Sequence, residues 1–251
     1  MSVRSPLPFW SPPPESLVVA PDEVHVWRVA LNQPAPQVQN LWQTLVAEER
    51  VRAMRFYFPR DREDFIVARG VLRALLGGYL KRHPSELCFS YSSYGKPALT
   101  TESGGATLCF NLSHSHGLAL YAIAHRRRLG IDVEWIRPDL ADEQIAKYFF
   151  SPREIAALCA LPHELQTEAF FLCWTRKEAY IKARGEGLSF PPDQFEVSLI
   201  PGEPATLLCT QGDPHEAARW SLQELVPGPG YVAALAVEGH HWRLQCWQWS
   251  V

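Results

Sequence analysis

The chain has 251 residues, of which 47% are hydrophobic and 20% are charged, a composition typical of a folded globular protein. Its net charge of −3 argues against a nucleic-acid-binding or membrane-surface protein. The six cysteines form no CxxC pair, the N-terminus has no signal-peptide pattern, and no apolar run reaches the roughly 18 residues that span a bilayer. We therefore expect a soluble, cytoplasmic protein with reduced thiols.

The first half of the chain contains strand and helix patterns in a recognisable order. Five prolines in residues 1–20 predict an extended arm outside either core. EVHVWRVAL (23–31) then alternates like a strand, and FIVARGVLRALLGGYL (65–80) has helical periodicity. A short strand pattern, ELCFSYSS (86–93), and two strands joined by a turn, TLCFNLSHSHGLALYAIAH (107–125), complete this half.

The second half repeats that order. GIDVEWIRP (130–138) corresponds to the opening strand, TEAFFLCWTRKEAYIKARG (167–185) to the long helix, QFEVSLI (194–200) to the short strand, and RWSLQELVPGPGYVAALAVEG (219–239) to the strand pair. We predict an α+β pseudodimer in which each half is a long helix packed on a small, mostly antiparallel sheet. The predicted parts are an arm at 1–20 and halves at 21–126 and 127–251, with the ligand site at their interface. The alternative is coincidence, because helices followed by strands recur in many α+β proteins.

Two carboxylates on one strand are the first chemical signal. In LGIDVEW (129–135), Asp132 and Glu134 are two residues apart and so lie on the same face, where two like charges need a cation nearby. Gly185 and Gly187 predict the end of the long helix, and along that helix Trp174, Glu178 and Lys182 form one stripe. Glu178 as a third carboxylate would complete an all-oxygen site suited to Mg²⁺, with Mn²⁺ as an alternative. Taken alone, Glu178 and Lys182 are more simply a surface ion pair.

Several polar positions could bind an anion. The turn Ser113–Gly117 offers hydroxyls, imidazoles and backbone N–H groups, although such a turn is more often only a turn. Lys96 lies in the tight turn YGKP. Arg52, Arg55 and Arg69 lie around the first long helix, where charges are normally solvated.

These motifs together resemble a known family. NLSHS, GIDVE and WTRKEAYIKARGEG, with GKP upstream, resemble the 4′-phosphopantetheinyl transferases of the surfactin-synthetase-activating type, across about residues 50–200. The resemblance implies a pseudodimeric fold. It also implies transfer of the phosphopantetheine arm of coenzyme A to a serine of an apo acyl or peptidyl carrier protein, with release of adenosine 3′,5′-bisphosphate.

The resemblance also implies a role for each matching residue. Asp132, Glu134 and Glu178 match Mg²⁺ ligands, Glu178 also matches the group that activates the carrier serine, and Lys182 matches the lysine that contacts the pyrophosphate. The implied coenzyme A contacts are Arg52, Arg69, Lys96, Ser113 and His114, with Arg52 at the 3′-phosphate. Glu49 stands where some members carry a lysine, so the 3′-phosphate would depend more on Arg52 and Arg69. His116 stands where glycine or a polar residue is common.

Two rival functions fit the same residues. A Mg²⁺-dependent pyrophosphohydrolase acting on a free nucleotide would also use three acids and a lysine, and a non-catalytic module could bind coenzyme A or a carrier protein. Carrier proteins are usually acidic with an apolar recognition helix, so we expect a partly apolar, basic docking surface on the second half. Phe149, Phe150 and Leu158 are candidates for it, although core packing is the simpler role for most of them. The internal repeat favours a monomer.

Overall fold

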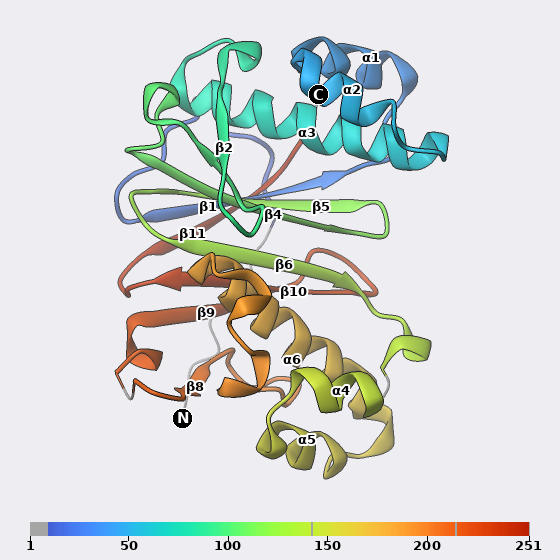
Figure 1. The fold of residues 1–251 in the computed structure, drawn as a ribbon, viewed down its shortest axis with the longest axis vertical. Coiled ribbons are helices and arrows are strands. Elements are labelled where there is room, and N and C mark those ends of the chain that lie inside the picture. Colours follow the sequence, from blue (N-terminus) through green and yellow to red (C-terminus); the bar gives the residue numbers. More distant parts are fainter. Residues whose placement is uncertain (1–9, 142, 214, 251) are drawn as a thin grey trace.

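Two β-sheets pack face to face at the centre of the molecule, and helices cover both outer faces (Figure 1). The structure is a computed structural model that describes residues 10–141, 143–213 and 215–250. Within these residues, no helix combines the length and the apolar character needed to cross a membrane.

The first sheet has the strand order β11-β1-β5-β4, and the second has the order β6-β10-β9. All neighbours are antiparallel except β1 and β11, which are parallel. Two short ribbons, β2–β3 and β7–β8, lie outside these sheets. The strands are β1 Glu23–Ala30, β2 Phe89–Tyr91, β3 Pro97–Leu99, β4 Leu108–Ser115, β5 Leu118–His125, β6 Leu129–Trp135, β7 Phe195–Val197, β8 Leu207–Thr210, β9 Trp220–Leu225, β10 Tyr231–Glu238 and β11 Arg243–Gln248.

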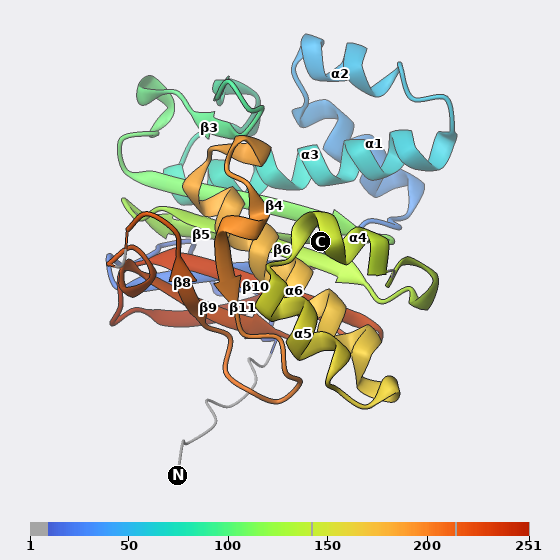
Figure 2. The ribbon, with the colours of Figure 1, turned by 60° about the horizontal axis from the view of Figure 1, so that its bottom comes forward.

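The helices cover the outer face of each sheet. On the first sheet α3 lies along the strands, beside α1 and α2, and on the second sheet α6 lies along the strands, beside α4 and α5 (Figures 1 and 2). The α-helices are α1 Ala35–Thr44, α2 Ala47–Ala53, α3 Pro59–Leu80, α4 Glu143–Phe149, α5 Pro152–Cys159 and α6 His163–Arg184. Short 3₁₀ turns are formed by Pro84–Glu86, Thr101–Ser103, Pro138–Leu140, Gly187–Ser189, Pro192–Gln194 and Ala217–Arg219.

The alternation of each strand decides which face meets the other sheet. Val24 and Val26 of β1 and the apolar row of β6 (Leu129, Ile131, Val133) are buried in one cluster between the sheets. The opposite rows pack on the helices; Trp27 and Val29, for example, lie in the core beneath α3. Fully burying an apolar side chain of this size contributes about 1.5–3 kcal/mol, so both faces stabilise the sandwich.

The two halves repeat one arrangement, and the predicted α+β pseudodimer is confirmed. In each half the last of the three strands in the chain lies between the first and the second, so that β1-β5-β4 corresponds to β6-β10-β9. The long helices α3 and α6 each have 22 residues. α6 ends at Arg184 because Gly185 takes a left-handed φ of +80°, which agrees with the predicted stop.

Residues near both ends of the described chain pack on parts of the molecule outside their own half of the repeat. Strand β11, from the end of the chain, pairs with β1 at the edge of the first sheet. Within the predicted arm, residues 1–9 lie outside the described residues. Trp10 packs on the core between the sheets, and Leu17 and Val19 pack on the core of the first half. The boundaries at 20 and 126 stay a prediction.

Candidate active site

Side chains join the two sheets where their edge strands β4 and β6 lie side by side. Ser113 Oγ donates a hydrogen bond of 2.8 Å to Asp132 Oδ1, and Ser115 Oγ donates one of 2.8 Å to Glu134 Oε2. The two serines are two residues apart on β4, and the two carboxylates are two residues apart on β6. Side chains two apart share a face of a strand, so both serine–carboxylate pairs form between the same two strand faces. The predicted pairing of Asp132 and Glu134 on one face is therefore present, and both carboxylates are fixed from the first half.

Helix α6 brings a lysine to the same place. Lys182 Nζ donates hydrogen bonds to Asp132 Oδ1 at 2.6 Å and to Ser113 Oγ at 3.0 Å. The approach depends on Gly130, because a Cβ atom there would lie 2.2 Å from the carbonyl oxygen of Ala179 on α6. A side chain at this strand position would push the helix, and with it Lys182, away from β6.

Glu178 is one turn of α6 from Lys182, but the two do not form the surface ion pair that was the simpler expectation. No salt bridge joins them within the described residues, and Lys182 pairs with Asp132 instead. Burial, followed by the negative charge of Asp132, raises the pKa of Glu178 above its usual range. The same two causes, in the same order, raise the pKa of Glu134. The three carboxylates therefore repel one another in a partly dry environment.

The chemistry of this cluster fits a hard cation. Asp132 Oδ2 is buried and has no hydrogen-bond partner among the described residues, which leaves one carboxylate oxygen available as a ligand. Oxygen donors with a net negative charge are what Mg²⁺ prefers in proteins. The side chains are not drawn together around one point, since the described part of the chain contains no group of three His, Cys, Asp or Glu residues arranged as metal ligands.

A cavity of about 1120 Å³ lies beside the cluster, on the side of the first half. Its wall includes three predicted coenzyme A contacts, Arg52, Arg69 and His114, together with the backbone turn around Gly95. Because side chains alternate along β4, His114 faces this cavity while its neighbour Ser113 faces Asp132. The end of β4 thus connects the cavity to the carboxylate cluster.

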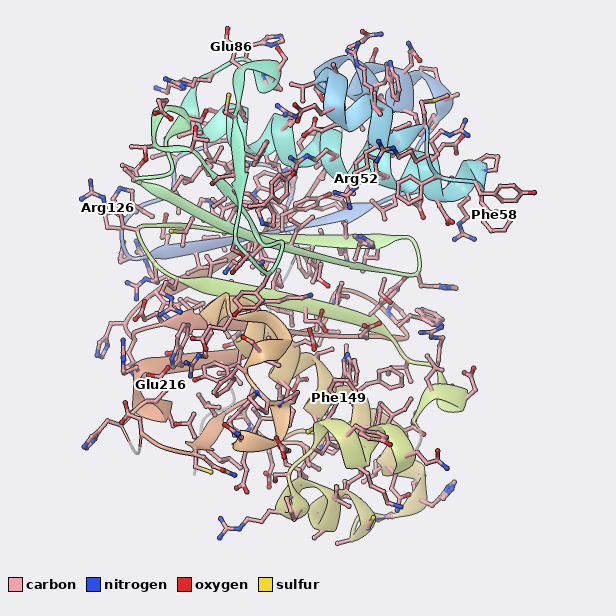
Figure 3. All side chains as sticks on the ribbon, viewed as in Figure 1. Arg52, Phe58, Glu86, Arg126, Phe149 and Glu216 are labelled. Atoms are coloured by element: carbon pink, nitrogen blue, oxygen red, sulfur yellow. The ribbon has the colours of Figure 1, made fainter. Side chains whose placement is uncertain are left out.

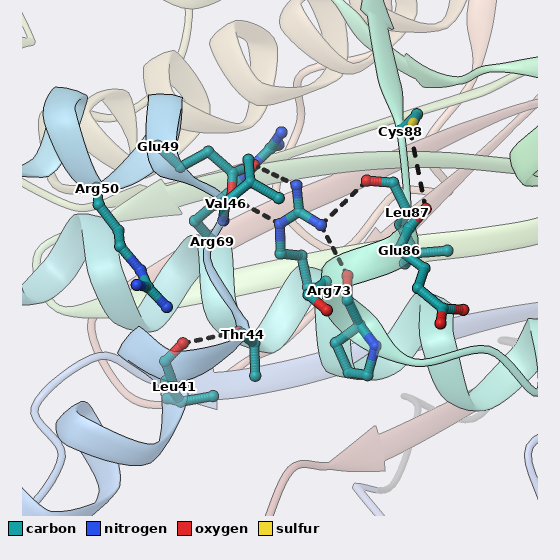
Figure 4. Close-up of polar contacts among 12 residues, drawn as sticks. Leu41, Thr44, Val46, Glu49, Arg50, Arg69, Arg73, Glu86, Leu87 and Cys88 are labelled. Atoms are coloured by element: carbon teal, nitrogen blue, oxygen red, sulfur yellow. Dashed lines mark hydrogen bonds and ion pairs between the residues drawn. The ribbon is translucent and has the colours of Figure 1, made fainter.

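A buried ion-pair network forms the back of the cavity (Figure 4). Glu49 accepts hydrogen bonds from Arg69 Nε at 2.5 Å and from Arg73 Nε and Nη2 at 2.6 and 2.9 Å. Arg73 also donates to the carbonyl oxygens of Pro84 and Leu87. Glu49, which departs from the pattern of the resembling family, therefore holds Arg69 and Arg73 in place. Arg69 lines the cavity with its guanidinium group already bonded to Glu49.

Lys96 and His116 make contacts that the sequence did not predict. Lys96 Nζ donates to the backbone carbonyl oxygens of Lys182, at 2.5 Å, and Leu129, at 3.2 Å, so its amine ties the first half to α6 and β6. The ring of His116 stacks on Trp135 with a centroid distance of 4.9 Å.

Sequence reasoning missed two residues that build the site, Ser115 and Gly130, and two that anchor α6 in the second half, Arg176 and Lys177. Ser115 repeats the role of Ser113 two residues later, and its signal was the polar alternation in SHS. Gly130 breaks the apolar pattern of a strand, which often marks a close backbone approach. Arg176 and Lys177 are fully buried and pair with Glu224 and Glu154, respectively. Nothing local distinguishes them from the exposed charges of α6.

The predicted docking residues lie mostly in the core. Phe150 and Leu158 are only 2% and 9% exposed, so they belong to the core, as the simpler alternative predicted, and are not docking residues. Phe149 points inward beside α6, where its ring lies 4.6 Å from that of Trp174 (Figure 3). These side chains close the packing of α4 and α5 on α6.

Comparison with known proteins identifies relatives along nearly the whole chain. Residues 128–236 match the family model of the 4′-phosphopantetheinyl transferase superfamily, and residues 32–126 match the model of the 4′-phosphopantetheinyl transferase N-terminal region. The chain is 46% identical over 240 residues to the 4′-phosphopantetheinyl transferase HetI of Nostoc sp. strain PCC 7120, covering 96% of this chain and 98% of that protein. It is 31% identical over 176 residues to the 4′-phosphopantetheinyl transferase Sfp of Bacillus subtilis strain 168, covering 69% and 76%, respectively.

Proposed function

The chain belongs to the 4′-phosphopantetheinyl transferase superfamily, and we propose that Asp132, Glu134, Glu178 and Lys182 form its catalytic centre. It transfers the phosphopantetheine group of coenzyme A to a serine hydroxyl of an apo carrier protein, giving the holo carrier protein and adenosine 3′,5′-bisphosphate. The observation that carries the assignment is the contact of Lys182 Nζ with Asp132 and Ser113, next to the unpartnered Oδ2 of Asp132.

The residues themselves perform most of the chemistry. The carrier serine Oγ forms a bond to the β-phosphorus of coenzyme A, and the bond from that phosphorus to the bridging oxygen breaks. Such a reaction depends on positioning and charge stabilisation more than on covalent help. Lys182 supplies positive charge to the leaving phosphate. Glu178 takes the serine proton as the general base of this step.

The three carboxylates would hold Mg²⁺, with Mn²⁺ as the alternative, because their oxygens and net charge suit a hard divalent ion. When bound, such an ion would neutralise charge on the pyrophosphate and relieve the repulsion between Asp132 and Glu134. Without it, the positive charge on these acids comes from Lys182, which pairs with Asp132, and from Arg137, which acts on Glu134.

Coenzyme A would occupy the 1120 Å³ cavity, which leads from α2 to the end of β4. Arg52 would meet the 3′-phosphate, and Arg69 and His114 would line the path to the cluster. Ser113 would meet the pyrophosphate, since it lies between Asp132 and Lys182. For Lys96, whose amine is bonded to carbonyl groups, the contact would come from the backbone of its turn. We further propose that the protein acts as a cytoplasmic monomer, with no nucleic-acid or membrane partner.

Metal binding tests this assignment without measuring activity. We expect Mn²⁺, titrated in the presence of coenzyme A and followed by electron paramagnetic resonance, to bind at one site. Replacing Asp132 with asparagine should weaken Mn²⁺ binding about tenfold or more. Mutating even the groups that orient a metal ligand typically lowers metal affinity by about 10–100-fold. The matched control is Glu168→Gln, an exposed acid on α6. Equal Mn²⁺ affinity in the Asp132→Asn variant would overturn the metal site.

A further inference from the structure

The turn between β4 and β5 has an unfavourable backbone conformation at a residue that is not glycine. Ser115 pairs with Leu118 across the hairpin, so His116 and Gly117 form a two-residue loop. Both have positive φ, +47° at His116 and +83° at Gly117. Such a loop usually begins with asparagine, aspartate or glycine, because other side chains crowd the backbone in the left-handed region. Contacts outside the turn are therefore needed to hold His116 in this conformation.

Two aromatic side chains of the second half provide these contacts. The ring of His116 stacks on Trp135, at the end of β6, with 4.9 Å between the centroids and an interplanar angle of 20°. The hydroxyl of Tyr231, at the start of β10, donates a hydrogen bond of 2.8 Å to the backbone carbonyl oxygen of His116. The ring of Tyr231 also lies edge-on to Trp135, at 4.7 Å. We call His116, Trp135 and Tyr231 the aromatic bridge, because they join the β4–β5 turn to β6 and β10 at the right-hand end of both sheets (Figure 1).

The aromatic bridge lies next to the contact between Ser115 and Glu134. Ser115 directly precedes His116, and Trp135 directly follows Glu134. Ser115 Oγ accepts a hydrogen bond of 3.2 Å from the backbone N–H of Trp135 and donates one of 2.8 Å to Glu134 Oε2. The strands β4 and β6 belong to different sheets, so no ladder of backbone hydrogen bonds joins them in the part of the chain that the structure describes. Side-chain contacts therefore decide how close the turn lies to Glu134.

We propose that the aromatic bridge positions the carboxylate of Glu134, and that His116 acts through Ser115 rather than by contacting coenzyme A. This inference rests on the proposed catalytic centre, because Glu134 is one of its three carboxylates. A group that orients a metal ligand typically accounts for about 10–100-fold in metal affinity. Ser115 is that group here, and the stack of His116 on Trp135 keeps its hydroxyl 2.8 Å from the carboxylate. His116 and Trp135 are therefore positioning residues of the site.

Mn²⁺ binding, followed by electron paramagnetic resonance in the presence of coenzyme A, tests the proposal. The test variant is His116→Asn, because asparagine tolerates the left-handed region and so keeps the turn while the ring is removed. The matched control is His241→Asn. His241 is exposed in the β10–β11 turn, has a φ of +59°, and makes no ring contact with the residues that the structure describes. His116→Asn should weaken Mn²⁺ binding by about tenfold, and the control should match the unmodified protein.

The affinity for coenzyme A separates positioning from ligand contact. His116 is not among the residues that line the large cavity in the described part of the chain. The Kd for coenzyme A, measured by calorimetry without metal, should therefore be the same in His116→Asn and in the unmodified protein. Weaker binding of coenzyme A in this variant would make His116 a ligand contact and overturn the proposal.

Two further variants test the route through Ser115. Trp135→Leu removes the other side of the stack and should weaken Mn²⁺ binding by a factor similar to that of His116→Asn. Adding His116→Asn to Ser115→Ala should cause no further loss of Mn²⁺ affinity, because both changes act through one contact. A further loss of about tenfold in the double variant would show that His116 acts independently of Ser115, which would overturn the proposal.

The remaining outcomes distinguish this inference from the proposed catalytic centre. Equal Mn²⁺ affinity in His116→Asn and the unmodified protein would overturn the role of the aromatic bridge and leave the catalytic centre standing. This holds also if urea unfolds the variant more easily, because a purely structural role of His116 predicts that combination. Failure of the unmodified protein to bind Mn²⁺ would overturn the metal site, and the role of the aromatic bridge with it.

Discussion

Replacing Glu49 with glutamine tests whether the arginines behind the cavity depend on this acid. Glu49 accepts four hydrogen bonds in all, three from Arg69 and Arg73 and one of 3.1 Å from the backbone N–H of Val46. Glutamine offers a single acceptor oxygen and turns an NH₂ group toward the guanidinium groups. At least two of the four hydrogen bonds are therefore lost, including at least one from Arg73, and Arg73, which is only 1% exposed, remains charged without its counter-ion.

The expected loss of stability is large. Removing one partner of a buried ion pair costs about 3–5 kcal/mol, and we take the lower end because Arg73 keeps its bonds to two carbonyl oxygens. In a chain of this size about 3 kcal/mol lowers Tm by about 6–12 °C. The matched control is Glu48→Gln, because Glu48 directly precedes Glu49 and its side chain is exposed. This substitution should change the free energy of unfolding by less than about 0.5 kcal/mol.

The pH dependence of unfolding sharpens this test. Burial alone would raise the pKa of Glu49, but the hydrogen bonds and charges of Arg73 and Arg69 outweigh it and lower the pKa below its ordinary value of 4.5. The stabilisation is therefore complete above pH 4.5 and is lost as the pH falls through the lowered value. Urea unfolding should show a constant gap between the unmodified protein and Glu49→Gln from pH 6 to 8, and a shrinking gap below about pH 4.5. A Tm change no larger than that of Glu48→Gln would refute the reasoning.

Three further changes have defined outcomes. Glu178→Gln should lower kcat by about 100-fold or more and leave the Kd for coenzyme A, measured by calorimetry, nearly unchanged; equal rates would remove Glu178 as the base. Lys177→Met should cost about 3–5 kcal/mol in urea unfolding, because it leaves Glu154 buried without the partner that now lies 2.8 Å away, and a loss under 1 kcal/mol would contradict that. Burial, helped by the charge of Arg128, lowers the pKa of Lys96 from 10.5 to about 8, so its charged amine destabilises the fold below pH 8 and ceases to do so by pH 10.5. The stability of Lys96→Met relative to the unmodified protein should therefore fall by about 1–3 kcal/mol over that interval, and a constant difference would contradict the shift.

Features that depend on neighbouring residues in the sequence were predictable. Alternation placed Asp132 and Glu134 on one face of β6, and the stop at Gly185 ended α6 where expected. The order of strands and long helices identified the internal repeat, because each half must bury the same kinds of faces. The motif residues Ser113 and Lys182 were candidates from the sequence, and the structure places both against Asp132, while their roles stay a prediction.

Features that depend on distant parts of the chain were not predictable. The pairing of β11 with β1 joins segments more than 200 residues apart, and no local pattern encodes it. Lys96 looked like a lysine presented by a turn, but its amine is captured by backbone carbonyl groups of the second half. Tyr148 on α4 and Phe150, directly after that helix, are both aromatic, yet Phe150 is buried and Tyr148 is 80% exposed. Which of them faces the core depends on how α4 packs on α6.

The most direct test of the central claim is intact-mass spectrometry of an apo carrier protein incubated with this protein, coenzyme A and Mg²⁺. The assignment of the catalytic centre predicts that the carrier gains the mass of one phosphopantetheine arm, and that the gain disappears when the metal is omitted or when Asp132 is replaced with alanine. Cleavage of coenzyme A without any gain in mass would indicate the hydrolase instead. An undiminished gain with the Asp132→Ala variant would contradict the assignment of the catalytic centre.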